Sequence, residues 1–168
     1  MGLDREPIAH ALATFAGLAH RIALVTTLDG VRYYDDSKGT NVGASVAALR
    51  GLAEPRAVLI AGGRDKLGDY GPLVEALRDR GRALVVIGEA AGRIAAAVGD
   101  AVETRHASSI EEAVALARSL ARPGDAVLLS PACSSFDMFR DYRERGDRFV
   151  AAARALAGSS AENRPGGL

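Results

Sequence analysis

The sequence predicts a single α/β domain, and three observations carry that prediction. Short apolar runs rich in β-branched residues alternate along the chain with stretches whose apolar residues recur at helical spacing. Several of the apolar runs are continuous, which is typical of strands buried on both faces of a parallel sheet. The chain has 168 residues, of which 48% are apolar, and this is enough for one domain with a sizeable core.

The expected strands begin with a hairpin. Residues 21–27 and 31–36 have strand-like composition, and the Asp29–Gly30 pair between them is typical of a hairpin turn, so these two strands should be antiparallel. Further strands are expected at residues 56–62, 83–88, 102–107 and 126–130. Because helical stretches separate them, we expect a Rossmann-like, mostly parallel open sheet of about six strands with helices on both faces.

The expected helices lie between these strands. Their ranges are 42–52, 70–81, 89–99, 108–121 and 136–158, and one more is expected at 6–18, ahead of the first strand. Pro72 fits a first helical turn, and the candidate capping residues are Thr40 or Asn41, Asp69, Ser108 or Ser109, and Ser134 or Ser135. Residues 158–168 are polar and rich in Gly and Pro, which predicts a disordered tail.

Composition argues against several classes of protein. The 21 basic and 21 acidic residues cancel, so the chain lacks the basic excess of a nucleic-acid or membrane-surface protein. Its one cysteine, Cys133, excludes a disulfide framework and a cysteine-based zinc site, and suits a reducing cytoplasm. The three histidines have no metal-ligand spacing, no stretch is long enough to span a membrane, and the N-terminus lacks a signal-peptide pattern.

Three strand-to-helix loops, at residues 35–41, 62–69 and 130–136, carry most of the candidate site residues. In a parallel sheet such loops lie at the carboxyl edge, where ligands bind, so we expect them to line one rim. The chain has two lysines, Lys38 and Lys66, and they lie in the first two of these loops. At every other position where the chain has lysine or arginine, the residue is arginine. A compact ammonium suits a carboxylate or a phosphate, so the rim is predicted to bind a small anion.

Structural roles compete with this hypothesis. Asp36 and Lys38 could form a solvated ion pair, Gly62 and Gly63 could serve turn geometry alone, and Cys133 fits a small buried apolar residue better than a nucleophile. The common glycine-rich phosphate-binding and dinucleotide-binding motifs are absent, as is the Gly-x-Ser-x-Gly motif of hydrolases. From the residues alone, the prediction stops at an α/β domain with an anion-binding rim.

At these loops the sequence resembles the C-terminal domain of the Mur ligases. Four stretches carry the resemblance, in family order: TFAGLAHR, DGVRYYDDSKGTNVGAS, AGGRDKLGDYGPL and VLLSPACSSFDMFRDYRERGDRF. They are most similar to the members that add D-glutamate to UDP-N-acetylmuramoyl-L-alanine in peptidoglycan synthesis. The sequence departs from the family pattern at Ala19, Gly39 and Tyr142, where Pro, Ala and Phe are common.

The resemblance implies roles for named residues and a larger enzyme. Arg21, Asp36 and Lys38 match positions that meet the nucleotide, and Thr40, Lys66, Ser135, Phe136 and Tyr142 match the D-glutamate pocket. Residues 21–157 would form the C-terminal domain, residues 1–20 would be a linker helix from a central ATPase domain that this sequence lacks, and the chain would be a fragment or a split subunit. That central domain would hold most of the ATP and the Mg²⁺, and no residue here is expected to be catalytic or to bind metal.

The implied reaction is the ATP-dependent formation of an amide bond. ATP would phosphorylate the carboxylate of UDP-N-acetylmuramoyl-L-alanine, and the D-glutamate amine would then attack the acyl phosphate to give the amide, ADP and phosphate. The isolated chain is expected to be inactive, cytoplasmic and monomeric, with no nucleic-acid or membrane partner. The alternative is a free-standing anion- or nucleotide-binding regulatory module, while the stretch SPACSSFD disfavours a related ligase that adds another amino acid.

Overall fold

The computed structural model describes residues 19–162, so the helix expected at 6–18 lies outside the described residues. An open sheet of six strands forms its centre, in the order β1-β2-β6-β3-β4-β5. The strands are β1 (Ala23–Leu28), β2 (Val31–Asp35), β3 (Ala57–Gly62), β4 (Gly81–Ile87), β5 (Glu103–His106) and β6 (Ala126–Leu129). The β1–β2 pair is antiparallel and the other four pairs are parallel, which confirms the predicted fold class.

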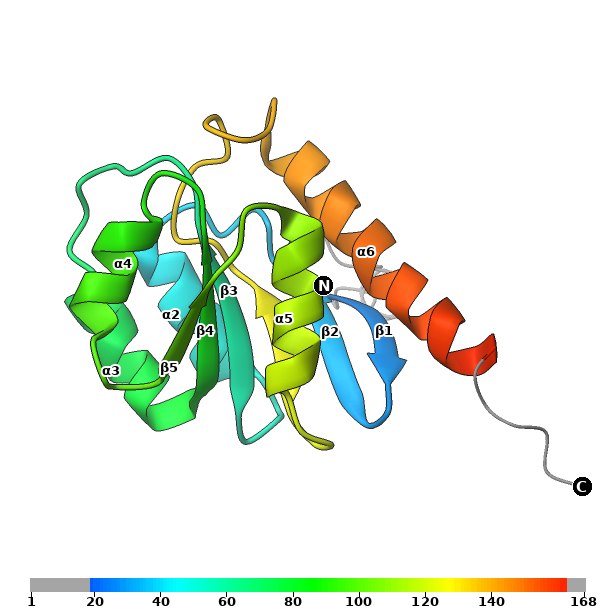
Figure 1. Cartoon of the computed structure of the whole chain (residues 1–168). Helices are drawn as coiled ribbons and strands as arrows, with labels where there is room; N and C mark the ends of the chain where they lie inside the picture. Colours follow the sequence, from blue (N-terminus) through cyan, green and yellow to red (C-terminus); the bar gives the residue numbers. More distant parts are fainter. Residues whose placement is uncertain (1–18, 163–168) are drawn as a thin grey trace, which may run out of the picture.

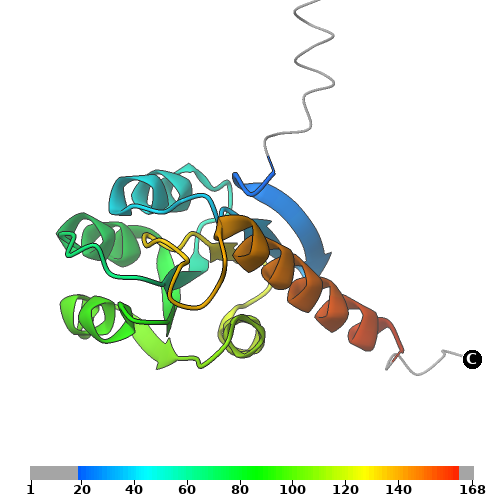
Figure 2. The same ribbon diagram turned by 90° about the horizontal axis from the view of Figure 1, so that it is seen from above.

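Helices cover both faces of the sheet (Figures 1 and 2). They are α2 (Val42–Gly51), α3 (Gly71–Arg80), α4 (Ala91–Val98), α5 (Ile110–Leu120) and α6 (Tyr142–Glu162). The first three pack on one face and the last two on the other, so successive residues of β3, such as Val58 and Leu59, belong to different cores. No described helix is long and apolar enough to cross a lipid bilayer.

Capping side chains set where several helices begin. Asn41 is the N-cap of α2, because its side chain accepts a hydrogen bond from the Ala44 amide at 2.8 Å. Ser109 caps α5 by accepting from the Glu112 amide at 3.1 Å. The helix α3 begins one residue later than expected, so Tyr70 and not Asp69 is at the N-cap position. The Asp69 side chain still accepts a hydrogen bond from the Gly71 amide at 2.8 Å. Each of these oxygens satisfies a backbone donor that has no partner inside the helix.

The last helix differs from the expectation at both ends. It begins at Tyr142 and not at residue 136, because the carbonyl of Ser135 accepts hydrogen bonds from the amides of Met138 and Phe139, forming a separate turn. The Asp141 side chain, which accepts from the Glu144 amide at 2.9 Å, occupies the position of the N-cap, so neither Ser134 nor Ser135 caps this helix. At the other end α6 continues to Glu162, so residues 158–162 are helical and were wrongly assigned to the tail. The sequence of α6 contains no proline, and Gly158 alone does not end the helix.

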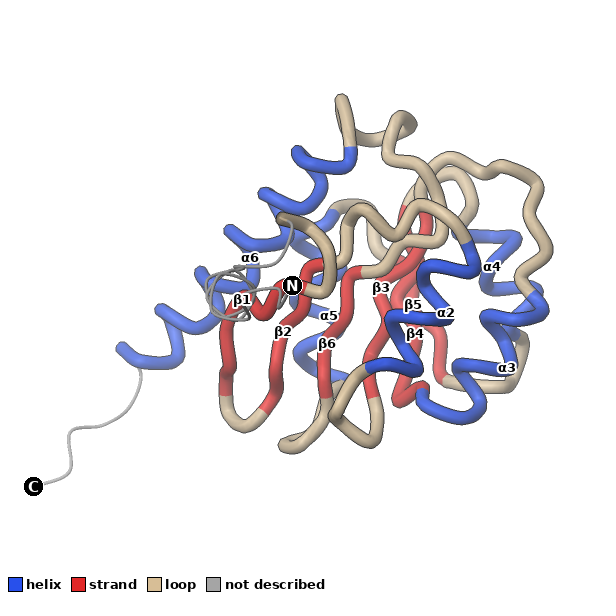
Figure 3. Tube along the Cα trace, turned by 180° about the vertical axis from the view of Figure 1, so that it is seen from behind, coloured by secondary structure: helices blue, strands red, loops and turns tan. Residues whose placement is uncertain are grey.

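The loops that follow β2, β3 and β6 lie together at the carboxyl edge of the sheet (Figure 3). Backbone hydrogen bonds tie them to one another: the Gly62 amide donates to the Pro131 carbonyl at 2.8 Å, and the Ala132 amide donates to the Gly39 carbonyl at 2.9 Å. The three loops are neighbours because β6 lies between β2 and β3 in the sheet. The rim expected from the sequence therefore exists, and it is built from segments about 90 residues apart in the chain.

Candidate anion-binding rim at the carboxyl edge of the sheet

The two glycines of the second loop bring it close to its neighbours. Gly62 and Gly63 have φ values of +124° and +134°, which disfavour other residues. A Cβ atom would lie 2.0 Å from the Ile87 carbonyl oxygen at Gly62 and 2.2 Å from the Ser134 carbonyl oxygen at Gly63. The close approach is thus between parts of the protein backbone, and structural geometry alone accounts for both glycines.

Asp36 lies just past the end of β2 and is nearly buried, with 6% of its surface exposed. Its Oδ2 atom accepts a hydrogen bond from the Ser130 hydroxyl at 2.6 Å. Burial raises the pKa of Asp36 above its ordinary value, although the Ser130 hydrogen bond opposes that shift. Asp36 is therefore a buried carboxylate held by Ser130, and the solvated ion pair with Lys38 is not its environment.

The residues matched to the nucleotide lie around one hollow. Arg21, Asp36 and Lys38 all line a space of about 420 Å³ between the first loop and α2. Small side chains of α2, including Ala44 and Ala47, form its other wall. A hollow with two cations, one carboxylate and an apolar wall has the donors and acceptors that a phosphorylated nucleoside needs.

Replacing Asp36 with asparagine should stabilise the domain near neutral pH, because the variant no longer buries a charge. The pKa of Asp36 is higher in the folded than in the unfolded protein, so its protonation favours folding. This contribution to stability is fully present below pH 3.8 and is lost as the pH rises through the raised pKa. We expect a gain of about 1 kcal/mol in the free energy of unfolding at pH 7, shrinking towards pH 3.8. Urea unfolding at several pH values measures it, and Asp100→Asn, at an exposed site, is the control. A loss of stability at pH 7 would contradict this account of Asp36.

Tyr142, the first residue of α6, lies against the cation that was matched to the nucleotide. The Lys38 ammonium is 5.4 Å from the centre of the Tyr142 ring, and the Arg143 guanidinium is 5.3 Å from it. The His20 ring meets the same ring edge-on, at 6.0 Å between centres. Tyr142 was matched to the D-glutamate pocket and Lys38 to the nucleotide, so the two predicted groups of residues share a wall.

Lys66 reaches back from the second loop to the first. Its ammonium donates a hydrogen bond to the Thr40 carbonyl oxygen at 3.2 Å, in an exposed position. A small hollow of about 80 Å³ adjoins it, lined also by Tyr70 and Ala132. One bond to a neutral carbonyl leaves two ammonium hydrogens for a ligand, so this lysine can bind an anion.

The remaining two predicted residues lie in the third loop. Ser135 is 2% exposed, and its backbone holds the turn that precedes α6. Phe136, the next residue, is 62% exposed. A large aromatic side chain left open at the rim can cover an apolar part of a ligand or of another protein surface.

Arg145 in α6 is a residue that the sequence analysis missed. It is fully buried, and its guanidinium donates to the Ser37 hydroxyl at 3.0 Å, the Ser37 carbonyl at 2.8 Å and the Cys133 carbonyl at 3.2 Å. It therefore joins the first loop to the third. A signal was present, since Arg145 precedes the buried Phe149 and Ala153 at intervals of four and thus lies on the apolar stripe of the helix.

Two further possibilities from the sequence were a nucleophilic cysteine and a metal site. Cys133 is 1% exposed and lies 3.5 Å from the Tyr70 hydroxyl, and burial raises the pKa of its thiol, as expected for a small buried residue. Within residues 19–162, no group of three His, Cys, Asp or Glu side chains could hold a metal ion.

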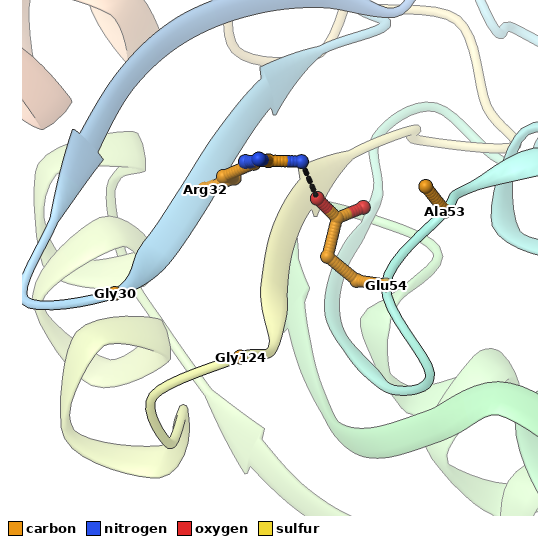
Figure 4. Close-up of a pocket in the computed structure, with 5 residues that line it drawn as sticks. All are labelled: Gly30, Arg32, Ala53, Glu54 and Gly124. Atoms are coloured by element: carbon orange, nitrogen blue, oxygen red, sulfur yellow. Dashed lines mark hydrogen bonds and ion pairs between the residues drawn. The ribbon is translucent and has the colours of Figure 1, made fainter.

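A further hollow, of about 270 Å³, lies at the opposite edge of the sheet (Figure 4). Its lining comprises Gly30, Arg32, Ala53, Glu54 and Gly124. Arg32 and Glu54 point towards one another there and form an ion pair at 3.0 Å, and the Tyr34 hydroxyl donates to the same Glu54 oxygen. Arg32 and the Oε1 atom of Glu54 are thus paired within the protein, and this hollow lies at the edge opposite to the predicted site residues.

Comparison with known proteins places the chain in a family. The family model described as "Mur ligase, glutamate ligase domain" matches residues 20–133. The chain belongs to the Mur ligase family. Among curated proteins, this Mur ligase domain is 50% identical over 157 residues to the UDP-N-acetylmuramoylalanine–D-glutamate ligase of Geotalea daltonii, covering 94% of the chain and 34% of that protein. The ligase of the same name from Marinobacter nauticus is 54% identical, over 92% of the chain and 35% of its own length.

Solved structures agree with the fold of this Mur ligase domain. The MurF ligase from Thermotoga maritima in complex with ADP has a TM-score of 0.57 and 15% identity, covering 93% of this chain and 36% of that one. Mycobacterium tuberculosis folylpolyglutamate synthase complexed with ADP has a TM-score of 0.63 and 18% identity, with the same coverage. At such identities the likeness concerns the fold. The chain spans about a third of the length of the curated relatives that it matches.

Proposed function

We propose that this domain binds D-glutamate and part of ATP in a cytoplasmic, monomeric ligase that adds D-glutamate to UDP-N-acetylmuramoyl-L-alanine during peptidoglycan synthesis. The observation that carries the proposal is the 50% identity, over 94% of the chain, to a protein named as that ligase. The rim supports it independently, because it presents two separate cations, Lys38 and Lys66, on adjacent loops.

The proposed division of the rim follows from the chemistry of the two ligands. D-Glutamate carries two carboxylates and an ammonium, for which Lys66, Thr40 and Ser135 offer a cation and hydrogen-bonding groups, with Phe136 and Tyr142 as aromatic walls. Around the larger hollow, Arg21 and Lys38 would meet phosphate oxygens, and Asp36 would accept from ribose hydroxyls or from an adenine amino group.

In the proposed reaction, ATP would supply the phosphoryl group that activates the carboxylate of the acceptor. The share of this domain would be to orient the D-glutamate amine for attack and to stabilise the developing charge. Closure against a central ATPase domain would bring the two halves of the site together and exclude water. Because the described residues offer no metal cluster, Mg²⁺ would be held mainly by that central domain.

A titration of the chain with D-glutamate, L-glutamate and ADP, followed by NMR, tests the proposal. We expect D-selective shifts at Thr40, Lys66 and Ser135 and ADP-dependent shifts at Asp36 and Lys38. Affinities should be weak, with dissociation constants of about 1 mM, because one domain forms only part of the cleft. Shifts with ADP alone would instead favour a nucleotide-binding regulatory module, and ADP formation by the isolated chain would contradict the proposed division of labour.

Lys66→Ala should weaken D-glutamate binding about tenfold, the loss expected for one charge-assisted hydrogen bond to a carboxylate. Lys38→Ala is the matched control, because it removes the same type of side chain from the neighbouring loop. It should weaken ADP binding and leave D-glutamate binding nearly unchanged. If Lys66→Ala altered ADP binding alone, the assignment of Lys66 to D-glutamate would be wrong.

A further inference from the structure

The loop that carries Lys66 contains a cluster of three side chains that the proposed function does not use. We call Asp65, Tyr70 and Arg93 the Asp65 cluster. Asp65 precedes Lys66 directly, Tyr70 ends the loop, and Arg93 lies in the first turn of α4. Figures 1 and 3 show α4 beside this loop. The cluster thus connects the loop to α4, the helix next to it.

Both carboxylate oxygens of Asp65 are engaged by the cluster and by the loop itself. Oδ1 accepts from the Leu67 amide at 2.8 Å and from the Tyr70 hydroxyl at 3.2 Å. Oδ2 pairs with the Arg93 guanidinium, which also donates to the Gly68 carbonyl at 3.4 Å and lies 5.5 Å from the centre of the Tyr70 ring. The two residues that flank Lys66 are therefore both bonded, Leu67 through its amide and Asp65 through its carboxylate.

The same contacts fix an unfavourable backbone conformation. Leu67 has a φ of +57°, in the left-handed region, which costs a non-glycine residue about 1 kcal/mol. The hydrogen bond from the Leu67 amide to the Asp65 side chain, two residues earlier, forms an Asx turn, which constrains the backbone between these two residues. Lys66 is the middle residue of this turn, and its ammonium donates to the Thr40 carbonyl at 3.2 Å.

Arg93 has a second effect, on charge. Asp65 is the residue next to Lys66 in sequence, so without a partner of its own its carboxylate could pair with the lysine ammonium. The guanidinium of Arg93 engages that carboxylate instead and holds the pKa of Asp65 below its ordinary value. Lys66 consequently keeps its charge available for an external carboxylate.

We propose that Asp65 and Arg93 are positioning residues that together hold Lys66 at the D-glutamate pocket. In this proposal, Arg93 also keeps the Asp65 carboxylate from pairing with the Lys66 ammonium. The proposal rests on the proposed function for the identity of the ligand, but the order of the Lys66 side chain can be measured without any ligand. Neither residue touches the hollow assigned to the nucleotide, so their effect should be confined to Lys66.

The presence of two lysines in the chain makes a direct test possible. In the 168-residue chain labelled with [¹³C]lysine, the ε-CH₂ groups of Lys38 and Lys66 give two NMR signals. Arg93→Met keeps the apolar stem of Arg93 and removes its charge and donors. We expect the ligand-free Lys66 signal to change in position and relaxation, the Lys38 signal to stay unchanged, and the dissociation constant for D-glutamate to rise about fivefold.

A double variant separates positioning from general loss of stability. Asp65→Asn added to Arg93→Met removes the uncompensated carboxylate, and it should recover part of the D-glutamate affinity lost in Arg93→Met. Arg78→Met, which breaks an exposed Arg78–Glu75 pair on α3, is the control and should change neither lysine signal. Unchanged Lys66 signals in Arg93→Met, or no recovery in the double variant, would overturn the proposal. Failure of the unmodified chain to bind D-glutamate would overturn the proposed function instead, since the ligand-free signals still report the position of Lys66.

Discussion

Arg145→Met is expected to lower the free energy of unfolding of this domain by about 3 kcal/mol. The variant keeps an apolar side chain of similar length in α6 but removes a guanidinium that donates three hydrogen bonds to Ser37 and Cys133. Each buried acceptor left without a donor costs about 1–3 kcal/mol, so the loss is roughly 6 kcal/mol in total. The net effect depends on an opposing contribution, the cost of burying the charge.

That opposing contribution can be put on the same scale. Burial lowers the pKa of Arg145 to about 10, so keeping it charged at neutral pH costs about 3 kcal/mol relative to an ordinary arginine. The variant recovers this cost, and the remaining loss is about 3 kcal/mol, which urea unfolding measures. Arg143→Met is the matched control, because Arg143 is two residues away and 68% exposed, and it should change stability by no more than about 0.5 kcal/mol. If Arg145→Met were as stable as the parent chain, the hydrogen bonds would only offset the burial of the charge.

Arg145 also illustrates how far the sequence could predict the site. The strand-to-helix pattern placed three loops on one rim, since parallel strands and right-handed crossovers leave little choice. The helical stripe that contains Phe149 could have marked position 145 as buried. Its partner Ser37, however, is 108 residues away in the chain, and such a pairing depends on the order of strands in the sheet, which local patterns do not encode.

Capping shows the same limit on a smaller scale. Ser134 and Ser135 precede an apolar helical pattern and were reasonable caps by composition. In the structure, the Ser135 carbonyl accepts the hydrogen bonds of a separate turn. The Asp137 side chain accepts a hydrogen bond from the Glu89 amide at 2.9 Å, and residues 136–141 stay outside the helix. The choice of Asp141 as the cap therefore depends on a contact with the loop after β4, and tertiary structure overrode a local signal.

Gly146→Ala, in contrast to the usual effect of alanine in a helix, should destabilise the domain by about 2 kcal/mol. Alanine in place of glycine inside a helix normally stabilises by about 1 kcal/mol. At Gly146, however, a Cβ atom would lie 2.1 Å from His20 Nδ1 and 3.0 Å from Asp35 Oδ2. The His20 ring cannot simply move aside, because Nδ1 is bonded to the nearly buried Asp35 at 2.6 Å. Overpacking costs about 1–3 kcal/mol and loss of a hydrogen bond to a charged group about 1.5–3 kcal/mol, so together they exceed the helix-propensity gain.

Gly158→Ala is the matched control, since Gly158 lies in the same helix with nothing within 4 Å of its added Cβ. It should be stabilising by about 0.5–1 kcal/mol, so the two variants should differ by about 3 kcal/mol in urea unfolding. The effect should also reach the rim, because the Lys38 amide donates to the His20 carbonyl at 3.0 Å and the His20 ring packs against Tyr142. A displaced His20 would shift the Lys38 signal and leave the Lys66 signal in place. Equal stabilisation by both alanines would mean that α6 can move away from His20, and the glycine would then have no packing role at the nucleotide end of the rim.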